Sequence, residues 1–398
     1  MVLVLAPSTA TAAEPVVPSH HRSGFLTELE GQPVFAHITP NWFASVMGTG
    51  IVATAAATLP VHVPGLLGAA RVVWVLDLLL LGVVVAATAA HRVQHPDRAR
   101  AHLADPVMAH FYGAPAMALM TVGAGAMLLG RPVIGDGAAL ALDAVLWTAG
   151  TLLGLWTAVA VPYRAFTDHD VTPGSAFGGW LMPVVPPMVS AATGTLLIPH
   201  LPAGEAQATL LVACYAMFGL TLVASLVIIT LIWGRLVQHK VGAAAAVPTL
   251  WIVLGPLGQS VTATHNLGVV APHLLPAPYG AAFSALGLVY GLPVWGFALL
   301  WGALALAVTV RTARTGLPFS LTWWSFTFPV GTVDTGTSGL AAATGLSLFT
   351  GAAVVLYLAL VAAWLVVAVR TARGVWSGRL LRAPAAPGRL GAPVTSPR

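Results

Sequence analysis

Charged residues are scarce in this sequence. Asp, Glu, Lys and Arg make up 7% of its 398 residues, whereas hydrophobic residues make up 58%. Soluble domains carry about 25% charged residues, so the composition excludes an ordinary soluble protein and indicates an all-α integral membrane protein. The single cysteine, Cys214, excludes an intramolecular disulfide, and no Cys and His residues have the spacing of a zinc site. We therefore expect no metal and no other cofactor.

A basic stripe within a folded polar segment is also missing. The formal charge of +5 belongs to loops and to the two ends of the chain. A protein that binds nucleic acid needs clustered Lys and Arg to neutralise phosphates, so we expect no nucleic-acid partner. The expected surroundings of this chain are the lipid bilayer.

Apolar runs of about 20 residues, long enough to cross a bilayer as a helix, recur along the chain. We predict ten of them, over residues 41–59, 66–90, 107–130, 139–161, 177–198, 206–234, 248–270, 281–310, 322–345 and 347–369. Apart from Arg71 and Arg131, every Lys and Arg then falls on the side that holds both termini. Cytoplasmic loops carry this excess. The sequence thus predicts a multi-pass protein of the cell membrane, with a transmembrane domain over 40–370 and disordered cytoplasmic tails over 1–39 and 371–398.

The odd-numbered spans share an internal repeat of about 70 residues. Each has an aromatic residue at its cytoplasmic entry: Trp42, Tyr112, Trp180, Trp251 and Trp323. Aromatic anchors are common at membrane interfaces, so the spacing is also what a series of similar helical hairpins would produce. The even spans differ because they consist mostly of Leu, Val, Ile and Ala, which suits a ring facing lipid.

Helix-breaking residues follow these anchors at a similar depth. They are Gly48, Gly50, Pro115, Pro183, Pro186, Pro256, Gly258, Pro329 and Gly331. Broken helices are tolerated in a membrane where the freed backbone groups are buried in protein or line an aqueous cavity. Helix ends and backbone N–H groups can receive anions there without a buried cation. We therefore expect these residues to kink the odd helices and to line a central pore. The alternative is that small residues mark only tight helix packing.

Three strings resemble one known family. They are Pro40-Asn41-Trp42-Phe43-Ala44-Ser45-Val46-Met47-Gly48-Thr49-Gly50, Leu254-Gly255-Pro256-Leu257-Gly258-Gln259 and Trp323-Trp324-Ser325-Phe326-Thr327-Phe328-Pro329. They are similar to the tellurite-resistance and dicarboxylate transporter family, which includes bacterial TehA, fungal malic acid transporters, fungal sulfite pumps and the plant guard-cell slow anion channel. The second string looks most like the sulfite-pump branch.

The resemblance implies ten helices arranged as five hairpins with quasi-fivefold symmetry, a pore within each subunit, and a homotrimer. It also implies that the phenylalanine before the proline of the ninth helix, Phe328, closes the pore. On its own, Phe328 would be read as a packed core aromatic.

Ionisable residues within spans call for a functional hypothesis because they are costly in lipid. Asp334 can be neutral because burial disfavours its charged form, can exchange a proton during coupled transport, or can face away from the pore and bond to a neighbouring helix. His110 and His265 can attract anions or sense pH when protonated, or can be satisfied core histidines. Asp77 and Asp143 lie in even spans, where contacts between helices or subunits are the better interpretation.

The sequence favours transport of a small anion and no enzymatic activity. Sulfite and C4-dicarboxylates such as malate are the first substrate classes, and outward movement is the natural direction because a negative cell interior drives anions out. The main alternative is a passive channel for monovalent anions such as chloride or nitrate. A haem protein would need paired histidines at one depth, and a cation channel would need acidic rings.

Overall fold

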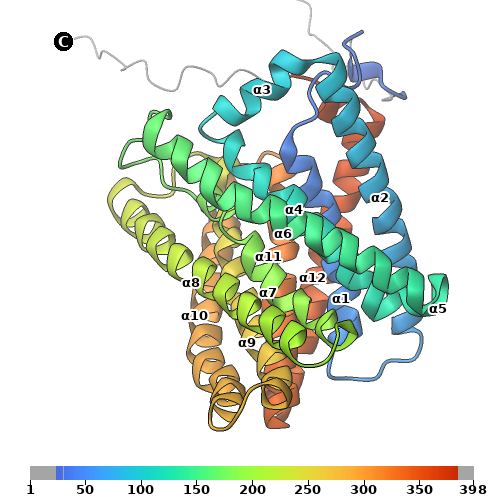
Figure 1. Cartoon of the computed structure of the whole chain (residues 1–398). Coiled ribbons are helices and arrows are strands. Elements are labelled where there is room, and N and C mark those ends of the chain that lie inside the picture. The colour runs from blue at the N-terminus through green and yellow to red at the C-terminus, as the bar shows by residue number, and fades with distance from the viewer. Residues whose placement is uncertain (1–23, 30, 384–398) are drawn as a thin grey trace, which may run out of the picture.

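A computed structural model describes residues 24–29 and 31–383, and every regular element within these residues is a helix (Figure 1). Long helices alternate with shorter, interrupted ones. We call the long ones the outer helices: α2 (Leu66–Gln94), α6 (Asp136–Thr167), α8 (Glu205–His239), α10 (Tyr279–Thr315) and α12 (Ser347–Trp376). The inner helices are α1 (Phe43–Thr58), α4 (Gly113–Gly125), α7 (Pro186–Thr193), α9 (Leu254–Leu274) and α11 (Phe328–Thr344). Two short helices, α3 (Pro96–Ala104) and α5 (Arg131–Ile134), lie at the ends of the bundle.

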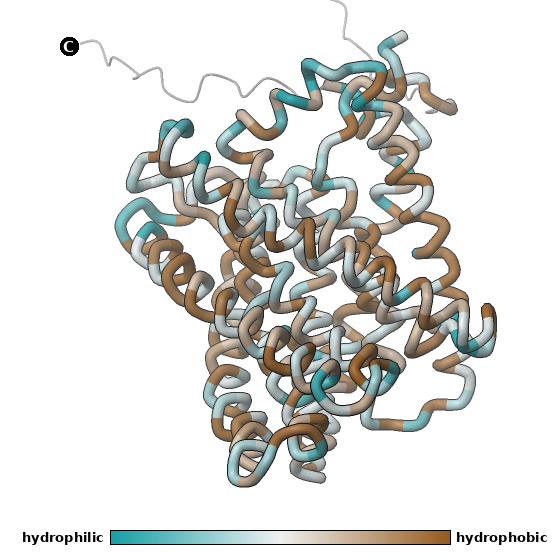
Figure 2. Tube along the Cα trace, viewed as in Figure 1, coloured by the Kyte–Doolittle hydropathy of each residue, from teal (hydrophilic) through white to brown (hydrophobic). Residues whose placement is uncertain are grey.

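The outer helices present an apolar surface to the surroundings. Leu79 on α2, Val159 on α6 and Val289 on α10 are 62%, 71% and 73% exposed, and Figure 2 shows hydrophobic residues along α8, with hydrophilic residues in the loop at its upper end. Such extended apolar surfaces are stable in lipid rather than in water. The chain is accordingly a multi-pass helical membrane protein.

Seven helical segments within the described residues are long and apolar enough to cross a membrane. Five of these are the outer helices, and the other two are Met108–Ile134, which contains α4, and Ala244–Leu274, which contains α9. The remaining inner helices α1, α7 and α11 have 16, 8 and 17 residues. These three α-helices are shorter because 3-10 segments and irregular turns take up part of each span.

The inner helices form a closed ring. Contacts run from α1 to α4, from α4 to α7, from α7 to α9, from α9 to α11, and from α11 back to α1. Each outer helix packs on the inner helix that precedes it in the chain and also on the next inner helix around the ring, so that α2, for example, contacts both α1 and α4. The ring therefore lies inside a second layer of helices that separates it from lipid.

Each inner helix follows a segment of 3-10 helix. These segments are Pro40–Trp42, Met108–Tyr112, Gly178–Leu181, Ala244–Val253 and Leu321–Phe326. The 3-10 turn is tighter than the α-turn and usually occurs in short pieces at helix ends. Its recurrence before every inner helix gives the repeat of the sequence a structural counterpart.

The prolines that were predicted to break the inner helices lie at this change of helix type. Pro186 opens α7, Pro329 is the second residue of α11, and Pro115 and Pro256 are each the third residue of their helices, while Pro183 precedes α7. Proline in the first turn of an α-helix costs little because the N–H that it lacks would have no partner within the helix.

Both ends of the described chain are more ordered than the predicted tails. The Leu26 N–H donates to the Trp376 carbonyl at 2.7 Å, and the Glu28 N–H donates to the Ser377 carbonyl at 2.8 Å. Leu29 and Leu381 are buried, at 6% and 7% exposure. The prediction of disorder is therefore wrong for residues 24–29 and 31–39 and for residues 371–383, because apolar side chains in both segments pack at one end of the bundle. Residues 1–23 and 384–398 lie outside the described residues.

A group of histidines ties the segment 31–39 to α2 and α3. His91 Nδ1 donates to the Phe35 carbonyl at 2.8 Å, and the His102 ring stacks on His91 with centroids 5.1 Å apart. From α3, Arg98 Nη1 donates to the Ala36 carbonyl at 3.3 Å.

Acidification is expected to loosen this attachment. Burial is the main cause that lowers the pKa of His102 from 6.5 to about 4, assisted by the positive neighbour His91, and burial also lowers the pKa of His37. The attached state then binds fewer protons than the free segment. Its stabilisation is complete above about pH 6.5 and is lost as the pH falls toward 4. Hydrogen exchange of residues 31–39, corrected for intrinsic rates, should therefore accelerate between pH 7 and pH 5.

The matched variant for this prediction is His102→Phe, which keeps a stacking ring and removes one titrating group. Its exchange should depend less steeply on pH than that of the wild type. Equal exchange at pH 7 and pH 5 in the wild type would contradict the prediction.

Candidate functional site

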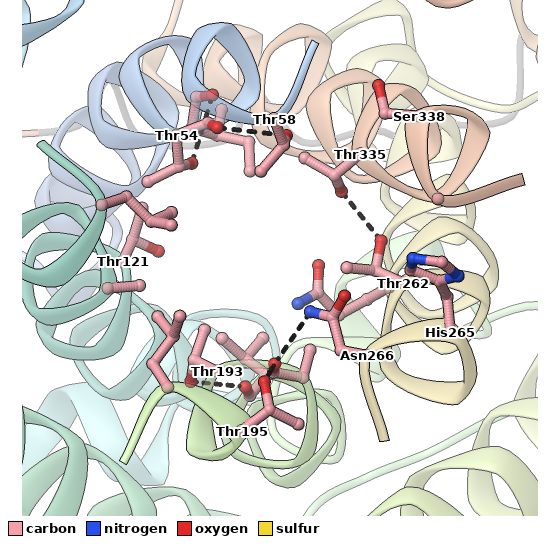
Figure 3. Close-up of a pocket in the computed structure, with 18 of the residues that line it drawn as sticks. Thr54, Thr58, Thr121, Thr193, Thr195, Thr262, His265, Asn266, Thr335 and Ser338 are labelled. Carbon is pink, nitrogen blue, oxygen red and sulfur yellow. Dashed lines mark hydrogen bonds between the residues drawn. The ribbon is translucent and has the colours of Figure 1, made fainter. Parts of the chain in front are cut away.

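A cavity of about 400 Å³ lies inside the ring of inner helices (Figure 3). Every inner helix contributes residues to its wall, and α4 and α7 also contribute through the turns that follow them. The polar lining consists largely of hydroxyl and amide side chains: Thr54, Thr58, Thr121, Thr193, Thr195, Gln259, Thr262, Asn266, Thr335 and Ser338. No Asp, Glu, Lys or Arg lines the cavity within the described chain, and its titratable lining residue is His265. The cavity thus carries neutral polar groups on a largely apolar wall, without a fixed charge among the described residues.

Helical spacing explains why these side chains share one space. Thr54 and Thr58 are four residues apart on α1, and Gln259, Thr262 and Asn266 follow at three and four residues on α9, which places each set on one face of its helix. Threonine is compatible with an otherwise apolar helix because its hydroxyl can bond to a carbonyl of the preceding turn. Thr54 does so with the Gly50 carbonyl at 3.2 Å.

Phe328 forms one part of this lining. It is the first residue of α11, is 3% exposed, and belongs both to the cavity wall and to the main apolar core. The preceding residue, Thr327, donates its hydroxyl hydrogen to the Trp324 carbonyl at 2.7 Å. The aromatic ring therefore meets the cavity from the position where the 3-10 segment gives way to α11.

The glycines that were predicted to line the pore lie at helix contacts instead. A Cβ atom at Gly258 would fall 2.3 Å from the Val333 backbone nitrogen, and one at Gly331 would fall 2.4 Å from the Ile51 side chain. A Cβ atom at Gly48 would overlap the Trp324 ring, and one at Gly50 would fall 2.4 Å from the carboxylate of Asp77. The structure thus differs from the pore-lining prediction because these glycines allow neighbouring helices to approach closely.

The ionisable residues separate into different places. His265 lines the cavity. His110 lies at the start of its span, where its ring stacks on Trp180 with centroids 6.1 Å apart. Asp334 is 0% exposed, lies outside the cavity lining, and has neither carboxyl oxygen in a hydrogen bond among the described residues.

Asp77 and Asp143 face inner helices. An oxygen of each carboxyl group lies where a side chain at Gly50 on α1, or at Gly123 on α4, would begin. This position agrees with the interpretation that the two residues make contacts between helices.

Most of the cavity wall was missed by sequence reasoning. The threonines and the two amides were not singled out, although Gln259 and Asn266 lie seven residues apart, two turns along one helix face. A search for polar residues repeated at three or four positions within the interrupted spans would have found them. The missing information was which face of each helix points inward.

Comparison with known proteins identifies the family. Residues 37–372 match the family described as SLAC1, voltage-dependent anion channel. The chain belongs to this family. It is 31% identical over 305 residues to the sulfite efflux pump SSU1 of Arthroderma otae, a match that covers 75% of this chain and 80% of the relative.

Two further relatives show the breadth of this family. The sulfite efflux pump SSU1 of Trichophyton rubrum is 31% identical over 314 residues, with 75% of this chain and 80% of the relative covered. An uncharacterized transporter of Methanocaldococcus jannaschii is 27% identical over 300 residues, with 75% of this chain and 82% of the relative covered. These matches confirm the resemblance carried by the three strings, and they identify the chain as an anion channel or transporter.

Proposed function

We propose that this protein carries small anions out of the cell, with sulfite or a C4-dicarboxylate such as malate as substrate, through a pore closed by Phe328. The observation that carries the proposal is a cavity enclosed by the ring of inner helices, which offers hydroxyl and amide groups but no fixed charge among the described residues. A carboxylate in the wall would repel an anion, and a buried Lys or Arg would hold it. Neutral hydroxyl and amide groups allow an anion both to enter and to leave.

The proposed architecture is ten transmembrane helices in five hairpins with quasi-fivefold symmetry. The closed ring of contacts and the repeated 3-10 segments support it. Length is sufficient for α11, one of the shorter helices: the six residues of Leu321–Phe326 rise about 12 Å and the 17 residues of α11 about 26 Å. Together they exceed the hydrocarbon core, which is about 30 Å thick.

We propose that both termini lie in the cytoplasm. Each outer helix has a basic residue in its last turn, namely His91 and Arg92, Arg164, His239, Arg314 and Arg373. The excess of positive charge marks the cytoplasmic side and concentrates anions at the inner mouth. A potential of 100 mV, negative inside, then drives each monovalent anion outward with about 2.3 kcal/mol.

The proposed transport unit comprises residues 40–370, and we propose that three such units form a homotrimer. Each subunit would then hold its own pore, because the inner helices of a single chain already close the ring around the cavity. The apolar outer helices are available for contacts between subunits and with lipid.

Sulfite is our first substrate because the relatives from Arthroderma otae and Trichophyton rubrum are named sulfite efflux pumps. The decisive experiment measures flux of sulfite, malate, chloride and nitrate in proteoliposomes, with and without a proton gradient. Movement of sulfite or malate supports the proposal. Movement of chloride and nitrate alone would identify a passive monovalent channel instead, and sodium flux without anion flux would overturn anion transport altogether.

Asp334→Asn is expected to transport at a rate within about twofold of the wild type, with the same response to a proton gradient. The carboxyl group is enclosed by protein, makes no hydrogen bond within the described residues, and does not line the cavity. An unpaired charge is too costly at such a site, so the amide should replace a neutral carboxyl group with little change. Proteoliposome flux checks this, with Asp143→Asn on an outer helix as the matched control. Loss of the gradient response in Asp334→Asn alone would instead show that Asp334 couples proton movement to transport.

A further inference from the structure

Every threonine that lines the cavity has its hydroxyl hydrogen already engaged. A carbonyl oxygen can only accept a hydrogen bond, so a threonine bonded to one must be the donor. Thr121 donates to the Met117 carbonyl at 2.7 Å and Thr193 to the Val189 carbonyl at 2.8 Å. Thr54, Thr58 and Thr195 likewise donate to the carbonyls of Gly50, Thr54 and Ala192.

Thr262 and Thr335 complete this set. Their hydroxyl oxygens lie 2.8 Å apart, and each also reaches a carbonyl of its own helix, Gly258 at 3.2 Å and Thr332 at 3.1 Å. Two hydrogens thus serve three hydrogen bonds, and neither is left for a ligand. The threonines that line the cavity (Figure 3) therefore offer it lone pairs and methyl groups rather than hydrogen-bond donors.

Free donors in the lining are concentrated on α9. Gln259 is 5% exposed, lines the cavity, and makes no hydrogen bond among the described residues. Neither amide atom is among the fully enclosed side-chain atoms that lack a partner in the described chain, so both reach the space of the cavity. Asn266, two turns along the same face, uses one N–H to donate to the Ala192 carbonyl at 3.2 Å and retains the second.

The other candidate donors are less suitable. Figure 3 shows the Ser338 hydroxyl directed away from the centre of the ring. His265 packs against α11, with its ring carbons 2.9 Å from the place where a Cβ atom at Gly339 would lie. Gln259 is therefore the amide in the lining that keeps both of its N–H donors as well as its carbonyl, whereas Asn266 already has one N–H in use.

We propose that Gln259 recognises the transported anion, and that the species it binds is an oxyanion that retains one proton, such as hydrogen sulfite or hydrogen malate. The NH₂ group of Gln259 donates to an oxygen of the anion. The proton of the anion is donated in turn to the Gln259 carbonyl or to a threonine lone pair. A bare halide or a fully deprotonated dianion would meet the same lone pairs with no proton to offer. This inference rests on the proposed function and specifies its substrate.

The test measures sulfite flux in proteoliposomes that have equal pH on both sides, with protein-free liposomes as the correction for permeation by neutral sulfur dioxide. One series between pH 6 and pH 8 holds the concentration of hydrogen sulfite constant, and a second holds that of the sulfite dianion constant. The rate should stay level in the first series and change with pH in the second. A rate that follows the dianion would overturn the proposal. The variant His265→Gln removes the titratable residue of the lining. It should show the same dependence of rate on pH as the wild type in both series, because the proton in question belongs to the anion.

Gln259→Leu tests the recognition residue itself. We expect the ratio of sulfite flux to chloride flux to fall at least tenfold, measured in a Phe328→Ala background so that both fluxes are large. The matched control is Gln207→Leu on α8, where the amide donates to the Leu201 carbonyl away from the cavity lining. A structural defect would lower both fluxes together, whereas loss of recognition changes their ratio. An unchanged ratio would overturn the role of Gln259 while anion transport stands, and a wild type that moves no anion would overturn the proposed function itself.

Discussion

Phe328→Ala is expected to raise anion flux at least tenfold. The Phe328 ring lies at the start of α11 and forms part of the cavity wall, so that removing it enlarges the passage at that point. Lowering the barrier to permeation by about 1.4 kcal/mol is enough for a tenfold increase. The measurement is the initial rate of sulfite and chloride flux in proteoliposomes, normalised to the amount of inserted protein.

Phe326→Ala is the matched control for this prediction. Phe326 is two residues earlier, and its ring packs edge-on against Trp251 and Trp323 with centroids 5.5 Å away in both cases. It lines a separate apolar groove between α10 and α12 rather than the central cavity. Both substitutions remove the same aromatic group, so both cost packing energy, but only Phe328→Ala should open the pore. Equal flux in wild type and Phe328→Ala, with both variants folded, would show that the barrier lies elsewhere.

Gly258→Ala is expected to destabilise the protein strongly. The new methyl group would lie 2.3 Å from the backbone nitrogen of Val333 and 2.4 Å from the backbone carbonyl carbon of Thr332. Backbone atoms cannot rotate away as a flexible side chain can, so α9 and α11 must separate. Overpacking of this kind costs about 1–3 kcal/mol and sometimes more. We expect a melting temperature several degrees lower in detergent and a reduced yield of folded protein.

Gly255→Ala, one turn earlier on α9, provides the comparison. A Cβ atom there meets no other part of the described structure within 4 Å, and alanine favours a helix by up to about 1 kcal/mol relative to glycine. This variant should be as stable as the wild type or more so. If the two variants melted at the same temperature, the close approach of α9 to α11 would not be a determinant of stability.

The prolines and the glycines show how far sequence reasoning reached. Proline restricts its own backbone wherever it occurs, so Pro115, Pro256 and Pro329 could be placed at a change in the helix from local rules alone, and that is where they lie. Glycine imposes no conformation, and its role depends on what lies opposite. Gly258 and Gly331 were therefore assigned to the pore, whereas the structure places them against neighbouring helices.

The residues of the candidate site divide in the same way, into one that the sequence could identify and one that it could not. Phe328 was placed by its resemblance to a family string and does line the cavity. Gln259 occurred in another such string but carried no assignment, because a lone amide in an apolar span has no signature of its own. Its importance appears only when the hydrogen bonds of the surrounding threonines have been followed.

The sequence by itself determined the membrane class, the alternation of two kinds of span, and the family, because hydropathy, charge placement and proline act locally and survive in one dimension. The tertiary structure decided that the inner helices close into a ring, which residues fill their contacts, and which polar groups remain free inside. Those outcomes depend on the direction of each side chain relative to helices far away in the chain. The scarcity of charge thus extends from the composition to the cavity, where hydroxyl and amide groups surround the proposed path of the anion.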